Sequence, residues 1–139
     1  MSKIILTTAA ANAAADAVAA LLDGGHLAIF EGAQPSSADL PLPRGTKLLA
    51  TLRFGTPAFK PAEDGAAHAH PMTPDKDAAA TGRPQWFRLY RADEETAVYD
   101  GDISPGPTGA LQMRALVVGQ HAEVHIDSCV IRMPISGAL

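Results

Sequence analysis

The sequence predicts a mainly β fold: an antiparallel, jelly-roll-like β-sandwich preceded by one short N-terminal helix. Three observations support this prediction. The chain has 11 Pro and 12 Gly among its 139 residues, and they divide it into short segments, as is typical of all-β domains. Several of these segments alternate apolar and polar side chains with the period of a strand. Only one segment, the Ala-rich stretch near the N-terminus, has helical character instead.

Length and charge narrow the possible functions. A chain of 139 residues can form a single domain, 1–139, with its own core, and we expect the helix at about 8–22 and the sandwich at about 26–134. The formal net charge of −4 argues against nucleic-acid binding, which normally needs a basic surface. No apolar run approaches the roughly 20 residues of a membrane span. We therefore expect neither nucleic acid nor a membrane as a partner.

The first predicted element is the helix. Thr7 or Thr8 can cap its N-terminus, and Ala has the highest helix propensity of all residues. Asp23-Gly24-Gly25 provides the C-terminal stop. The expected apolar stripe of this helix consists of Val18, Leu21 and Leu22. Because the stripe is narrow, we expect the helix to lie as a lid on the edge or end of a sheet.

Two alternating segments follow the helix. Residues 26–31 form the first predicted strand, and residues 47–54 form the second. Between them, residues 32–45 make a long loop that contains three Pro, and such loops often carry contacts. A short hairpin is predicted around Glu63-Asp64-Gly65. The second strand is expected to place Leu48, Ala50, Leu52 and Phe54 on one face.

The aromatic segment 85–91 is the centre of the predicted fold. It contains the only Trp, and with residues 96–101 it predicts a hairpin whose turn is Ala92-Asp93-Glu94-Glu95. A strand that is apolar on both faces is usually central in a sheet or covers an interface. Alternation places Phe87 and Leu89 on one face, and Trp86, Arg88 and Tyr90 on the other.

The last predicted strand includes residues 121–127, where polar and apolar residues alternate. Beyond it, apolar residues occur on both faces, which predicts a β-bulge near Ser128. Cys129 is expected to be a small buried hydrophobic side chain. As the single Cys it cannot form an intramolecular disulfide, which suits folding in a reducing cytoplasm. The polar side of the strand carries His121, Glu123, His125 and Asp127.

One pattern resembles a metal site. His68 and His70 lie two residues apart on one strand face, and His121 could complete a set of ligands. The surroundings do not match the His-x-His pattern of cupin enzymes, because Gly65 lies only three residues before the pair and Asp75 lies beyond two Pro. Hydrogen-bonded or solvent-facing His is favoured, so the sequence predicts neither a metal nor a cofactor.

No set of catalytic residues is predicted either. His125 with Glu123 or Asp127, and Ser128 nearby, would be simple strand neighbours, and no nucleophile elbow is present. The polar faces of the hairpin and of the last strand are therefore interpreted as partner interfaces. The predicted interface residues are Trp86, Arg88, Tyr90, His121, Glu123 and His125.

A series of motifs carries a family resemblance through its order and spacing along the chain. The most visible is Trp86-Phe87-Arg88-Leu89 with Thr96-Ala97-Val98-Tyr99-Asp100-Gly101. The others occur at residues 21–32, 34–35, 38–39, 48–52, 58–59, 118–120, 128 and 133–134. Through most of its length the chain thus resembles a family of small structural proteins encoded by tailed bacteriophages and prophages. It differs in the charge-rich segment 60–83 and in Glu94-Glu95, where relatives tend to have Ser, Gly and Thr.

The resemblance implies a virion component without catalytic residues, most similar to a capsid cement or decoration protein. It implies two partners, the major capsid protein and other copies of the chain as a homodimer or trimer on capsid symmetry axes. The location implied is the capsid exterior, after synthesis in the host bacterial cytoplasm. Two alternatives stay open: a tail, neck or baseplate module that grips sugar through Trp86, Arg88 and Tyr90, and a metal-dependent jelly-roll enzyme that uses the His residues.

Overall fold

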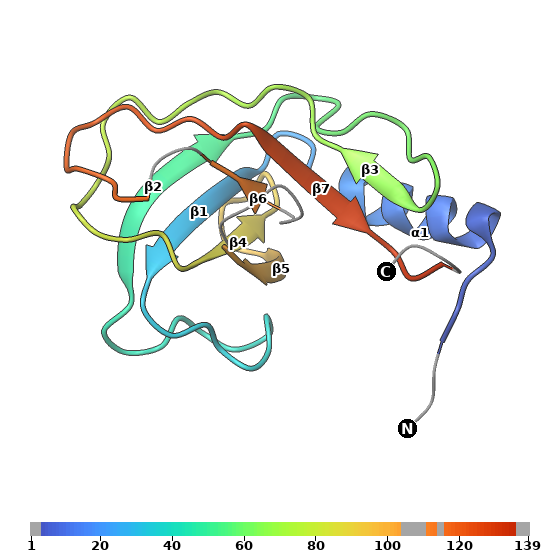
Figure 1. Cartoon of the computed structure of the whole chain (residues 1–139), viewed down its shortest axis with the longest axis horizontal. Coiled ribbons are helices and arrows are strands. Elements are labelled where there is room, and N and C mark those ends of the chain that lie inside the picture. Colours follow the sequence, from blue (N-terminus) through green and yellow to red (C-terminus); the bar gives the residue numbers. More distant parts are fainter. Residues whose placement is uncertain (1–3, 104–110, 114–115, 136–139) are drawn as a thin grey trace.

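The fold is mainly β, as predicted, with two antiparallel sheets and one short helix (Figure 1). The computed structural model describes residues 4–103, 111–113 and 116–135. The elements are α1 (Thr8–Ala20), β1 (His26–Glu31), β2 (Lys47–Arg53), β3 (Ala66–His68), β4 (Trp86–Tyr90), β5 (Ala97–Asp102), β6 (Leu111–Gln112) and β7 (Ser128–Arg132). The first sheet has the strand order β2-β1-β4-β5, and the second has the order β3-β7-β6.

The two sheets share one hydrophobic core, which is consistent with a β-sandwich. The jelly-roll arrangement and the single domain over 1–139 stay predictions. Figure 1 shows β7 crossing obliquely to the strands of the first sheet and running toward helix α1. In the described part of the chain, no helix combines the length and the apolar character needed to cross a membrane. The core includes Leu27, Ile29, Phe87 and Leu89 from the first sheet and Ala67, Leu111, Cys129 and Ile131 from the second.

Helix α1 begins and ends close to its predicted bounds, but most of the face that it buries consists of Ala. The hydroxyl of Thr7 accepts a hydrogen bond from the N–H of Ala10 at 3.1 Å, which caps the N-terminus. Of the predicted stripe, Leu22 is buried and Val18 is partly buried against the core, whereas Leu21 is 41% exposed and its assignment is wrong. A face of small Ala side chains lets the helix approach β3 and β7 as a lid at one end of their sheet. The buried residues are Ala11, Ala15, Ala19 and Leu22.

Strand β4 is central, and its two faces are divided as predicted. Phe87 and Leu89 are 0% exposed and belong to the core between the sheets. On the opposite face, Trp86 packs with Ala28 and Phe30 in a separate apolar cluster. Because β4 pairs with both β1 and β5, every residue from Trp86 to Leu89 is buried.

A β-bulge shifts the predicted faces of β2. Ile29 pairs with Ala50, but the next residue of β1, Phe30, pairs with Leu48. Leu49 is the extra residue, and the bulge turns its side chain into the core at 0% exposure. Leu48, predicted to lie on the apolar face, is instead 40% exposed.

The hairpin predicted around residues 63–65 is confirmed, whereas the last strand is shorter than predicted. Backbone hydrogen bonds join 58–60 to 68–70 on either side of the turn. The predicted strand over 121–127 is wrong: His121 has a positive φ of 70°, and the segment contacts residues 75–78 through a single bridge, Asp75 to Val124, and scattered backbone hydrogen bonds instead of a continuous ladder. The bulge predicted near Ser128 is wrong too, because β7 keeps one register against β3 and β6. Apolar residues on both faces suit β7, the central strand of its sheet.

Candidate functional site

The polar face of the hairpin contains a buried ion pair. Arg88 and Asp100 are direct cross-strand partners on β4 and β5. Nε of Arg88 donates to Oδ1 of Asp100 at 2.6 Å and Nη2 donates to Oδ2 at 3.0 Å, while both side chains are at most 5% exposed. The hydrogen bonds to Asp100 raise the pKa of Arg88 further above its usual range. In this bidentate geometry each charged group is paired with the other inside the structure. Removing either partner would destabilise the fold, because the remaining charge would be buried and unpaired.

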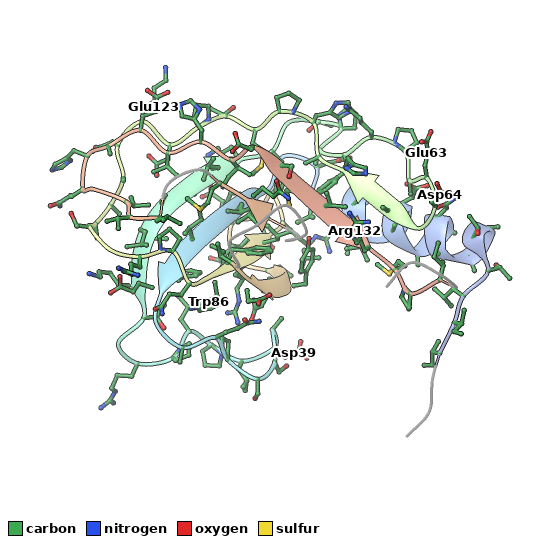
Figure 2. The ribbon with its side chains drawn as sticks, viewed as in Figure 1. Asp39, Glu63, Asp64, Trp86, Glu123 and Arg132 are labelled. Atoms are coloured by element: carbon green, nitrogen blue, oxygen red, sulfur yellow. The ribbon has the colours of Figure 1, made fainter. Side chains whose placement is uncertain are left out.

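Trp86 lies beside this pair and is also enclosed. Its side chain is 1% exposed, and its ring lies 4.6 Å from the ring of Phe30, measured between centroids. The guanidinium of Arg88 lies 5.5 Å from the centroid of the Trp86 ring, within the range of a cation–π interaction. Figure 2 shows Trp86 on the side of the sheet from which the loop with Asp39 extends. Neither Trp86 nor Arg88 is available to a sugar or a partner unless the sheet opens.

Tyr90 forms the partly open rim of the same face. Its ring stacks on His26 with 4.7 Å between centroids and an angle of 13°. Burial, and secondarily the charge of Arg53, lowers the pKa of His26 below its usual value. An ion pair between Arg53 and Glu94 closes this end of the sheet. Of the three hairpin residues predicted to face a partner, only Tyr90 has appreciable exposed surface.

The other three predicted interface residues lie elsewhere. His121, Glu123 and His125 belong to an exposed irregular segment, and Figure 2 shows Glu123 on the opposite side of the molecule from Trp86. Nδ1 of His121 lies 2.6 Å from Oδ1 of Asp77, and Nε2 of His125 lies 3.0 Å from Oε1 of Glu123. Exposed pairs of this kind contribute little to stability. The structure therefore does not bring the six residues into one surface, and a partner interface at any of them stays a prediction.

The His residues do not converge on a metal site within the described residues. There, no group of three or more His, Cys, Asp and Glu side chains is placed to hold a metal ion. His68 lines a surface pocket with Arg132, whereas His70 lines a different pocket with His125. His121 pairs with Asp77 instead of approaching them. The three His residues that the metal-dependent enzyme would need as ligands therefore lie apart from one another.

The most distinctive concave feature is an apolar groove between helix α1, β5 and β7, which we call the β5 groove. Its volume is about 480 Å³. It is also lined by Asp100, Gly101 and the exposed Arg132. The walls come from three segments that are distant in the sequence, so sequence patterns could not predict the groove. The apolar stripe at Val18 and Leu21 is the part of its lining that the sequence did show. The apolar lining includes Val18, Leu21, Val98, Tyr99, Val130 and Met133.

Comparison with known proteins adds no relative. No family model matches the chain, and neither a curated protein nor a solved structure matches it. The resemblance to tailed-phage structural proteins therefore stays an expectation based on the sequence motifs.

Proposed function

We propose that the chain is a non-enzymatic structural protein of a tailed-bacteriophage particle, acting as a cement protein on the exterior of the capsid. The observation that carries this proposal is the β5 groove, an open apolar surface with no cluster of reactive side chains among the described residues that line it. Such a surface suits docking better than chemistry. The sequence motifs supply the class of partner, the major capsid protein.

The physical properties of the chain suit this role. The loop at 32–45 contains Pro35, Pro41 and Pro43, which restrict its free conformations and so reduce the entropy lost on docking. A shell presents many identical sites, so several weak contacts made by a homodimer or trimer on a symmetry axis give a high total affinity. We infer that the chain binds the capsid as such an oligomer.

Two alternatives use other features. A tail, neck or baseplate module would need the same kind of docking surface, so the groove favours neither location. Its glycan-binding form is less well supported, because Trp86 is 1% exposed and Arg88 is paired with Asp100. A metal-dependent enzyme lacks support for the reason given above: the His residues are dispersed among the described residues.

A deletion experiment tests the proposal. Phage particles assembled without the chain should contain complete tails but have heads that lose DNA on mild heating or chelation. Purified chain added afterwards should restore head stability, because a cement protein binds the finished shell from outside. Particles with stable heads and missing or defective tails would contradict the proposal and favour the tail or neck alternative.

A further inference from the structure

Strand β5 is an open edge of the four-stranded sheet as far as the described residues extend. At the opposite edge, β2 is covered: Arg53 and Thr73 exchange backbone hydrogen bonds, and the N–H of Ala79 donates to the carbonyl of Leu49 at 2.8 Å. In contrast, β5 pairs with β4 alone, and among the described residues no isolated bridge reaches it. An uncovered edge presents backbone donors and acceptors to which another strand can bind.

The register shows which backbone groups face outward. In an antiparallel pair, hydrogen-bonded and non-hydrogen-bonded residue pairs alternate. The N–H of Ile103 donates to the carbonyl of Gln85 at 3.0 Å, so the next hydrogen-bonded pair is Gly101 with Phe87. Between such pairs lies Asp100, whose backbone N–H and C=O therefore point away from β4. They point toward the side where a further strand would lie.

The β5 groove runs along this open edge. One wall is formed by β5, through Val98, Tyr99 and Gly101. The other is formed by Val130 of β7 and by Met133, the residue that follows β7. A strand added to β5 would project alternate side chains into this space. The combination of an open backbone edge with an apolar groove favours a polypeptide occupant over a compact small molecule.

Charge further specifies the occupant. Arg132 is exposed at the groove and makes no ion pair with the described residues, whereas Asp100 is already neutralised by Arg88. The groove thus combines apolar walls with one unpaired cation. A second copy of β5 is a poorer match for this cation, because the carboxylate of its Asp100 is already paired with Arg88.

We propose that β5 and the β5 groove bind an extended segment of a partner protein by strand addition. The backbone of the segment pairs with the edge of β5, its alternate aliphatic side chains fill the groove, and a carboxylate pairs with Arg132. Because β5 has 6 residues, the segment is of similar length. This inference rests on the proposed function, in which the segment belongs to the major capsid protein.

Peptide titration of the isotope-labelled full chain, followed by NMR, tests the site. The probe is an end-blocked peptide of alternating Val and Thr with one Asp. It should shift the amide signals of β5 and of the groove residues, and methylation of its edge-facing backbone nitrogens should weaken binding at least tenfold. Arg132→Glu should weaken the Asp peptide about tenfold, or about 1.4 kcal/mol, and should favour a Lys-containing peptide. Arg44→Glu makes the same charge change in an exposed loop and should leave binding unchanged.

Three results would overturn the inference. The first is that, at millimolar peptide, the amide signals that shift belong only to surfaces other than β5 and the groove. Another is equal binding of the N-methylated peptide, because strand addition requires those backbone groups. The third is displacement of the peptide by dodecanoate with loss of all β5 shifts, which would make the groove a site for an apolar carboxylic acid.

Binding to empty capsid shells separates this inference from the proposed function. If the unchanged chain and Arg132→Glu cosediment with shells equally well, the docking site is wrong while the cement role stands. If the unchanged chain does not cosediment at all, the cement role is wrong, and the peptide titration alone decides what the groove binds.

Discussion

Replacing Trp86 with Ala should destabilise the folded chain by roughly 3–5 kcal/mol, the usual cost of removing a buried aromatic side chain. Trp86 is 1% exposed and packs against Phe30 with 4.6 Å between ring centroids. Its apolar cluster otherwise contains only Phe30, Ala28 and part of Tyr90, so few neighbours can collapse into the cavity. Arg88 also loses the aromatic face 5.5 Å from its guanidinium. We therefore expect the upper half of that range.

Urea unfolding followed by circular dichroism measures this loss without relying on Trp fluorescence. Trp86→Phe is the matched control: it keeps an aromatic ring, and Nε1 of Trp86 has no hydrogen-bond partner among the described residues. We expect that control to lose no more than about 1.5 kcal/mol. An unchanged unfolding midpoint for Trp86→Ala, with a defect only in assembly, would refute the reasoning and show that the hairpin is an interface.

Three further predictions follow from particular contacts. Gly101→Ala should cost about 1–3 kcal/mol, because the new Cβ would lie 2.4 Å from Cζ of Phe87, and adding Phe87→Leu should recover part of the loss in the same urea assay. Burial raises the pKa of Cys129 to about 12, so iodoacetamide at pH 8 should modify the folded chain far more slowly than the unfolded chain; equal rates would contradict this burial. Burial lowers the pKa of His26 below 6.5, so protons bind the unfolded chain first and stability should fall as the pH drops below about 6.5. His26→Gln should reduce that dependence and His125→Gln, at an exposed position, should not; the reverse would show that other groups cause it.

The elements that the sequence predicted well are those with strong local patterns. The aromatic residues of 86–90 and the turn signals at 92–95 are sufficient for a hairpin, and alternation assigned Phe87 and Trp86 to the correct faces. These features depend on the order of side chains along one strand, which the sequence records directly.

The features that were predicted wrongly are those that depend on which segments of the chain are neighbours in space. Alternation over 121–127 indicates which side chains face inward, and Val124 is indeed buried. It cannot indicate that the neighbouring segment, residues 75–78, makes only scattered backbone hydrogen bonds instead of a ladder. The bulge that buries Leu49 depends on pairing with β1. The Ala part of the buried helix face was not predicted, because Ala11 and Ala15 are too small to form a visible apolar stripe.

The candidate sites also depend on contacts between distant segments, which local sequence patterns do not show. Pairing of Arg88 with Asp100 requires the register between β4 and β5, which alternation alone does not fix. The β5 groove joins helix α1 to strands far along the chain, so no local pattern could predict it.

The number and position of copies in the phage particle test the central proposal most directly. Quantitative mass spectrometry of purified particles, combined with cryo-electron microscopy, measures both. We expect hundreds of copies, with density for the chain on the outer surface of the capsid. A few copies per particle, with density at the neck, tail or baseplate, would contradict it.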